Sequence, residues 1–93
     1  MKPLADCMSR HAAKRARQRG IAPALVERVL AHGREAFDHR GGVVLYVDRA
    51  TRERLRCRGA SGRDVDRLRD VYVVVTGGTI ATVGHRYRRL RRQ

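Results

Sequence analysis

Histidine and arginine occur together near the N-terminus in a combination that could handle a phosphate group. His11 is followed by Arg15 and Arg19, four and eight residues further on. In a helix, this spacing places the three side chains on one stripe. An imidazole can move a proton near neutral pH, and a guanidinium can hold a phosphate. The stripe is therefore a candidate phosphate site, and the alternative is an ordinary polar helix surface.

A second combination lies near the C-terminus, in the segment Thr82-Val83-Gly84-His85-Arg86-Tyr87. In a strand, alternation places Thr82 and Gly84 on one face and His85 on the other. A strand that ends near Gly84 would let His85 and Arg86 point the same way, because glycine often marks a bend. The alternative is a histidine at a sheet edge beside a basic tail.

Two histidines surrounded by arginines are sufficient for RNA cleavage without a metal. One imidazole takes the proton from the ribose 2′-hydroxyl, the other protonates the leaving oxygen, and cations stabilise the charged intermediate. We predict His11 and His85 as the acid–base pair, with Arg15 and Arg86 holding the phosphate. The predicted substrate-binding residues are Arg19, Thr82, Tyr87, Arg88 and Arg89. The tail from Arg86 to Arg92 could equally be a solvated chain end.

The sequence does not predict a metal site or a cofactor. Cys7 and Cys57 are isolated, and the chain has no C-x-x-C motif. The four histidines lack ligand spacing, and the nine carboxylates do not cluster as a two-metal site requires. We expect His32 at a helix end and His39 in a turn to have no role in the site.

The formal net charge is +13, from 22 Lys and Arg against 9 Asp and Glu. Such a field attracts polyanions, and phosphate neutralisation dominates nucleic-acid affinity. We expect a nucleic-acid partner, RNA rather than DNA, and an acidic antitoxin or immunity protein would be a second suitable partner. The alternative is a solvated basic surface that reflects a GC-rich genome, since all but two of the cations are arginine.

A chain of 93 residues is long enough for one domain and one small core. We predict a single domain over residues 1–93, with a lead-in at 1–8 and a basic tail at 87–93. The longest apolar run is strand-sized, so we expect no membrane partner. The first residues lack the apolar core of a signal peptide, which predicts a cytoplasmic protein. A toxin domain cut from a larger secreted protein would look the same.

The elements that must position these residues can be read from caps and periodicity. Ser9 can cap a helix over residues 10–19, which Gly20 would end in the left-handed conformation. Pro23 opens a second helix that ends at Gly33. Strands are expected at 35–39, 43–47, 71–75 and 79–85, with 71–75 buried on both faces or nearly so and a Gly-Gly turn after Thr76.

Residues 49–58 permit either a strand with one wet face or a helix capped by Asp48, and we favour the helix. A further short helix is expected after Ser61, so that extra helices occupy residues 49–69. The predicted fold class is α+β, with two N-terminal helices packed on a roughly four-stranded antiparallel sheet.

The pattern Ser9-x-His11-Ala12-x-x-Arg15-x-x-x-Arg19-Gly20-Ile21, followed by a late strand Thr79-Ile80-Ala81-Thr82-Val83 that leads into His85-Arg86, resembles the domain of unknown function (DUF) 4258 family. The resemblance covers about residues 9–88. It implies a RelE-, barnase-, EndoU- and colicin-like fold and a metal-independent ribonuclease toxin. The segment 49–70 is longer than that family's pattern suggests. Because that family includes members without an assigned activity, the resemblance supports the fold more than it supports catalysis.

Two functions follow as hypotheses. The first is a metal-independent endoribonuclease, the toxin of a toxin–antitoxin pair. The second is a basic nucleic-acid-binding or ribosome-associated protein without turnover. The first requires His11 and His85 to face a common phosphate, whereas the second requires only the cationic surface.

Overall fold

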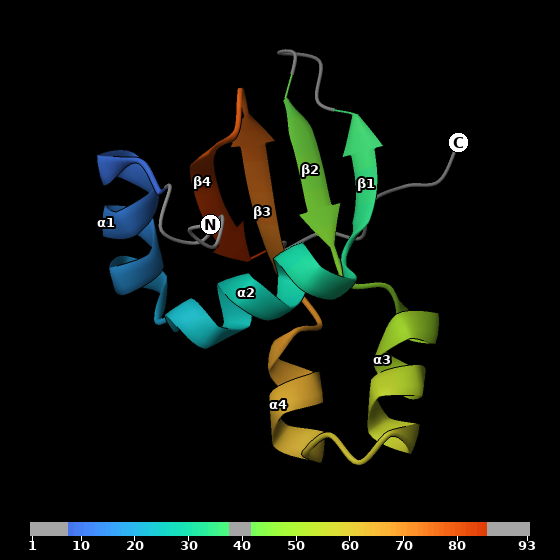
Figure 1. Cartoon of the computed structure of the whole chain (residues 1–93). Coiled ribbons are helices and arrows are strands. Elements are labelled where there is room, and N and C mark those ends of the chain that lie inside the picture. Colours follow the sequence, from blue (N-terminus) through green and yellow to red (C-terminus); the bar gives the residue numbers. More distant parts are fainter. Residues whose placement is uncertain (1–7, 38–41, 86–93) are drawn as a thin grey trace.

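The structure, a computed structural model, describes residues 8–37 and 42–85. Four helices and a four-stranded antiparallel sheet give an α+β fold (Figure 1), which confirms the predicted class. No helix within the described ranges is long and apolar enough to cross a membrane.

The two N-terminal helices begin and end where the sequence predicts. Helix α1 spans Arg10–Arg19; the Ser9 hydroxyl accepts from the Ala12 N–H at its start, and Gly20 ends it at φ 67°. Helix α2 spans Pro23–His32, with proline in its first turn, where the missing N–H has no intrahelical partner to lose. The two helices pack against the sheet (Figure 1).

The sheet has the strand order β1-β2-β3-β4, with β1 at Arg34–Phe37, β2 at Val43–Tyr46, β3 at Val71–Thr76 and β4 at Thr79–His85. All three pairings are antiparallel. The β3–β4 turn places Gly77 and Gly78 at φ 57° and 78°, as the Gly-Gly turn predicts. The predicted strand residues 38 and 39, including His39, lie outside the described residues.

The prediction that residues 71–75 are buried on both faces or nearly so holds only in its weaker form. Val71 and Val73 are fully buried, whereas Tyr72 and Val74, which alternate with them, are only half-buried. The reason is that α2 covers one face of the central strands, and no helix among the described residues covers the other. We call these the helix face and the open face of the sheet.

The core lies between the helix face and the two N-terminal helices. Ala12 and Ala16 of α1, together with Val26 and Val29 of α2, pack with the buried sheet residues Val71, Val73, Ile80 and Val83. Small residues on α1 allow its backbone to approach the sheet closely. Burial of each valine contributes about 1.5–3 kcal/mol.

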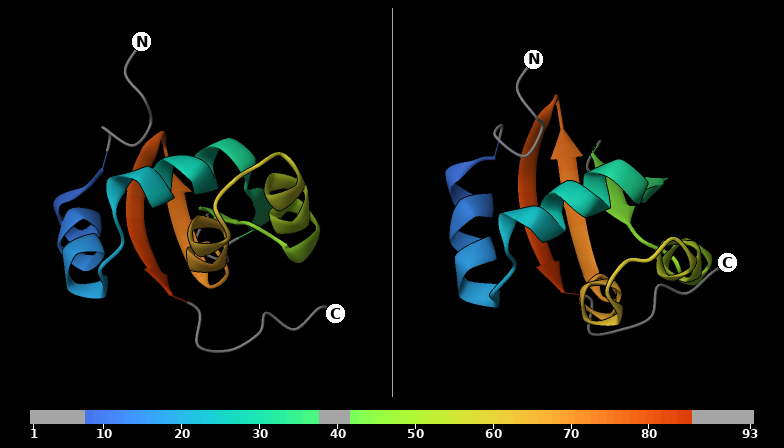
Figure 2. Two further views of the ribbon diagram at one scale, coloured as in Figure 1. Left: turned by 90° about the horizontal axis from the view of Figure 1, so that it is seen from below. Right: turned by 60° about the horizontal axis from the view of Figure 1, so that its bottom comes forward.

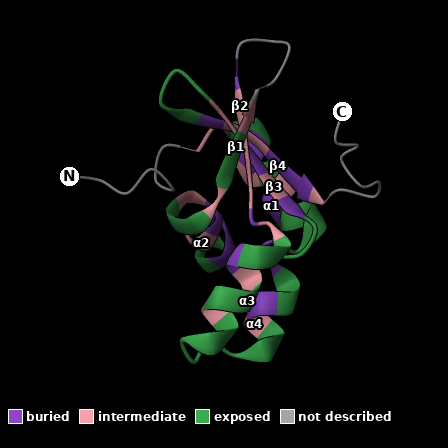
Figure 3. Cartoon of the chain, turned by 90° about the vertical axis from the view of Figure 1, so that its right-hand side faces the viewer, coloured by how far each residue is buried: buried purple, intermediate pink, exposed green. Residues whose placement is uncertain are grey.

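For residues 49–58 the sequence permitted either a helix or a strand. The structure confirms the helix that we favoured. Helix α3 spans Arg49–Cys57 and helix α4 spans Gly62–Arg67, and both lie beyond one end of the sheet (Figure 2). Asp48 caps α3 by accepting from the Thr51 N–H at 2.8 Å. An ion pair between Arg56 and Asp66, with N···O 2.8 Å, joins the two helices. Their outward sides are largely exposed (Figure 3).

Candidate functional site

Helix α1 is anchored to the edge strand β4 by the residue that caps it. The Ser9 N–H donates to the Ile80 carbonyl at 3.0 Å, and the Ser9 hydroxyl donates to the Ala81 carbonyl at 3.2 Å. The β3–β4 register shifts at this point, since Val74 pairs with Thr82 but Val75 pairs with Ile80. Such a bulge leaves one residue unpaired and turns its carbonyl away from the ladder. The two predicted catalytic segments are therefore neighbours.

The two predicted catalytic histidines nevertheless sit at different ends of this contact. His11 is exposed, two residues after the Ser9 anchor at Ile80 and Ala81. His85 is the last residue of β4, four residues beyond Ala81, which is about 13 Å along a strand. A shared phosphate would require both side chains to reach across that span. The packing of α1 on β4 makes the two elements neighbours. The backbones of His11 and His85 nevertheless remain apart.

The faces of the sheet separate the remaining β4 residues. His85 pairs with Val71 and lies on the helix face, half-buried. Thr82 pairs with Val74 and lies on the open face. These positions agree with the alternation predicted for the strand, and they place Thr82 and His85 on opposite sides.

On α1, Arg15 is half-buried and Arg19 is exposed. Both are on the helix that flanks β4 (Figures 1 and 2). The other predicted site residues lie outside the described part of the chain: Arg86, Tyr87, Arg88 and Arg89.

The open face carries an aromatic pair that the sequence analysis did not single out. Tyr46 of β2 and Tyr72 of β3 are directly opposite each other in the register. Directly opposed residues of an antiparallel pair share one face. This row of the sheet continues to Arg34 on one side and Gly84 on the other, and the next row consists of Ala36, Val44, Val74 and Thr82.

The Tyr72 ring lies over Gly84. A Cβ atom placed on Gly84 would be 2.8 Å from the Tyr72 hydroxyl oxygen and 3.0 Å from two ring carbons. The ring therefore rests on the neighbouring strand where glycine leaves room, and this contact covers the Gly84 backbone. Tyr72 is half-buried, so part of the residue remains accessible.

Charge at the β1 end of this row is organised by Asp48. The Arg34 guanidinium donates to the Asp48 carboxylate at 3.0 Å. Hydrogen bonds from the Thr51 hydroxyl and N–H, with a smaller effect of Arg34, lower the pKa of Asp48 to about 2. Asp48 in turn raises the pKa of Arg34 through the hydrogen bond and its charge. This ion pair is fixed by the α3 cap, and it places one guanidinium next to Tyr46.

Further ion pairs lie away from this row. Arg28 pairs with Asp64, and Arg56 pairs with Glu53 and Asp66. Residues 8–37 and 42–85 contain no group of three metal-ligating side chains.

A strand-by-strand reading could have located the aromatic pair, because Tyr46 and Tyr72 occupy predicted strands. It could not have paired them, since the pairing depends on a register across residues 47–70. Comparison with protein-family models, with curated proteins and with solved structures found no match to this chain. The resemblance to the DUF 4258 family accordingly stays a prediction that rests on the short motifs.

Proposed function

We propose that this chain binds single-stranded RNA on the open face of its sheet, with the tyrosine pair as a stacking surface and arginines around it as phosphate ligands. The proposal rests on the cross-strand pair Tyr46–Tyr72, which lies on a sheet face that no described helix covers. Aromatic rings on an accessible surface stack on unpaired bases, and each stacked base contributes about 1–3 kcal/mol.

The electrostatic part of the proposal rests on the net charge of +13. Arg34 lies in the same row as the tyrosines, and Arg15 is on α1, the helix that packs on β4. Guanidinium groups suit bidentate contacts with phosphate oxygens. Extended RNA places a phosphate beside each base, so a stacking surface bordered by cations matches its repeat.

Fluorescence anisotropy of a labelled, unstructured RNA oligonucleotide tests this proposal. We expect affinity to fall steeply with salt, because bound phosphates release counterions. Tyr72→Leu should weaken binding about tenfold through lost stacking, with an unchanged salt slope. Tyr72→Phe keeps the ring and should bind like the wild type. An oligonucleotide of the same sequence in DNA tests whether the ribose 2′-hydroxyl contributes, because stacking and phosphate contacts are common to both.

A matched charge variant separates stacking from phosphate contact. Arg15→Gln should reduce the salt slope by about one, whereas Arg63→Gln, an exposed arginine on α4, should leave binding nearly unchanged. Equal affinity of the wild type and Tyr72→Leu would contradict the proposal. If Tyr87→Leu alone abolished binding, the interface would instead belong to the C-terminal segment.

A second candidate, metal-independent RNA cleavage by His11 and His85, is favoured by one observation. Ser9 fixes the start of α1 on β4, so the two histidine-bearing elements touch. In this reading the enzyme is a toxin whose acidic antitoxin would cover the cationic surface. Purified protein incubated with total RNA and EDTA should then cleave it, and His11→Ala or His85→Ala should each abolish cleavage. Intact RNA would remove this candidate and leave the binding function.

A further inference from the structure

A pocket between the end of α2 and one side of α3 gathers groups that bind anions. Its volume is about 250 Å³, and it is lined by Ala31, His32, Thr51, Arg54, Leu55 and Arg58. Two of the lining side chains are guanidinium groups, and a third is an imidazole. None of these residues belongs to the open face or to the α1–β4 contact, so the pocket is separate from the interface proposed above.

One wall of the pocket is a single stripe of α3. Thr51, Leu55 and Arg58 are spaced by four and three residues, and Arg54 adjoins them. Thr51 is buried, and its hydroxyl accepts from the Arg54 guanidinium at 3.2 Å. The same threonine donates its N–H to Asp48 at the α3 cap. Arg54 is thereby held by the residue that fixes the start of the helix.

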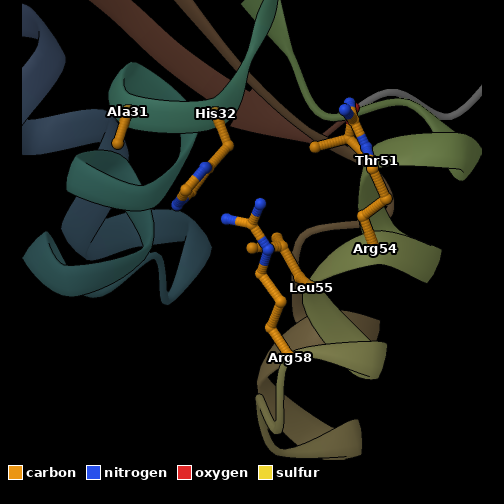
Figure 4. Close-up of a pocket in the computed structure, with 6 residues that line it drawn as sticks. All are labelled: Ala31, His32, Thr51, Arg54, Leu55 and Arg58. Atoms are coloured by element: carbon orange, nitrogen blue, oxygen red, sulfur yellow. The ribbon is translucent and has the colours of Figure 1, made fainter.

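The opposite wall is the last turn of α2. His32 is the final residue of that helix, where exposed carbonyls favour a positive charge. Figure 4 shows the His32 ring and the Arg58 guanidinium directed toward each other across the pocket. Both groups are hydrogen-bond donors, and a guanidinium cannot accept. Both side chains are exposed, and an oxyanion that enters the pocket would be the acceptor for both.

No described side chain supplies that acceptor. The salt bridges of residues 8–37 and 42–85 do not include His32, Arg54 or Arg58. Nearby cations repel one another unless an anion offsets them, and a guanidinium prefers a planar or tetrahedral oxyanion that accepts two hydrogen bonds.

We propose that this pocket binds a phosphate group carried as a small phosphomonoester. Arg58 would donate to the phosphate oxygens, and His32 would donate from the opposite wall. Arg54, whose guanidinium lies against Thr51, would add positive charge at the edge of the pocket. The volume is slightly below the range of about 300–1,000 Å³ for drug-sized ligands, which leaves room for a small attached group. Leu55 and Ala31 form an apolar surface for that group.

Thermal unfolding of the whole chain in sodium phosphate, compared with sodium chloride of equal ionic strength, tests the proposal. A ligand that binds the folded state raises the unfolding midpoint with its concentration. We expect a saturable rise in phosphate that chloride does not reproduce. Arg58→Gln should raise the half-saturating phosphate concentration about tenfold or more, as expected for a lost charge-assisted hydrogen bond.

Arg17→Gln is the matched control, because it removes one exposed arginine on α1, on the other side of the molecule from α3 (Figure 1). It should respond to phosphate as the wild type does. Similar responses from Arg58→Gln and Arg17→Gln, or from phosphate and chloride, would overturn the pocket and indicate general screening. Tyr72→Leu should not alter the phosphate response, which distinguishes this site from the RNA interface.

Three ligands identify the source of the phosphate in a titration followed by amide NMR shifts. Orthophosphate and adenosine 5′-monophosphate should shift the amides of His32, Thr51 and Leu55, with the nucleotide binding more tightly. A dinucleoside monophosphate without a terminal phosphate should not shift them. If only this phosphodiester bound, or if the shifts spread evenly over α1, the phosphomonoester proposal would fail.

Discussion

The Tyr72 ring covers Gly84, its register partner on the neighbouring strand. A Cβ atom on Gly84 would be 2.8 Å from the Tyr72 hydroxyl oxygen, closer than such atoms normally approach. The Tyr72 ring can take this orientation only because Gly84 of β4 has no side chain. An aromatic ring that rests on a strand is also held in place for stacking, so the pair connects the fold to the proposed RNA surface.

Gly84→Ala is expected to displace the Tyr72 ring, because the added methyl group occupies its position. We expect destabilisation of about 1–3 kcal/mol, typical of overpacking. RNA affinity should fall along with it, toward that of Tyr72→Leu. Urea unfolding and anisotropy measure the two effects. The double variant Gly84→Ala with Tyr72→Leu should recover stability relative to Gly84→Ala; additive losses would show that the ring is not the obstacle.

Ser9→Ala should destabilise the fold by about 1–2 kcal/mol, because it removes the α1 cap and the hydroxyl bond to Ala81 together. Ser61→Ala is the control, since the Ser61 side chain makes no cap hydrogen bond at the start of α4. Chemical unfolding should find that variant within about 0.5 kcal/mol of the wild type. Equal losses in both variants would mean that Ser9 does not anchor α1 through its hydroxyl.

Asp48 should make stability depend on pH in the acid range. Its folded pKa, about 2, is below the ordinary aspartate value of 3.8, so the unfolded state binds the proton more readily. The contribution is therefore complete above about pH 4 to 5 and is lost as the pH falls through about 2. Urea unfolding at pH 5 and at pH 2.5 should reveal a loss of about 1–2 kcal/mol from this group.

Two variants identify which interactions of Asp48 cause this dependence of stability on pH. Asp48→Asn retains a capping oxygen and should remove this part of the pH dependence. Arg34→Gln removes the ion pair and should retain most of it, because the hydrogen bonds from Thr51 are the larger cause. A flat profile in Arg34→Gln would instead assign the effect to the salt bridge.

Val73 and Val74 are neighbours on opposite faces of β3, and they should respond differently to truncation. Val73 is fully buried against the helices, so Val73→Ala should cost about 2–4 kcal/mol. Val74 is half-buried on the open face, and Val74→Ala should cost about 1 kcal/mol or less. Equilibrium unfolding measures both. Equal costs would indicate that the open face is covered in solution.

Local chemistry was sufficient to predict the elements and the charge. Ser9, Gly20, Pro23 and Asp48 mark helix ends through interactions within a few residues, and Gly77-Gly78 specifies its turn in the same way. The α+β class follows from their order. The candidate residues on α1 and β4 were also identified by type and spacing alone, and α1 indeed packs beside β4.

The tertiary structure alone decided which face each residue occupies and which distant segments meet. A valine-rich strand can be covered on one face or on two, and only the position of α2 leaves Tyr72 and Val74 on an open face. Likewise, His32 and Arg58 line one pocket only because the end of α2 lies near α3. The register of long-range strand pairs sets these relations, and no local pattern encodes it. The hydrogen bonds of Ser9 to Ile80 and Ala81 anchor α1 on β4, and they leave His85 about 13 Å along the strand from that anchor.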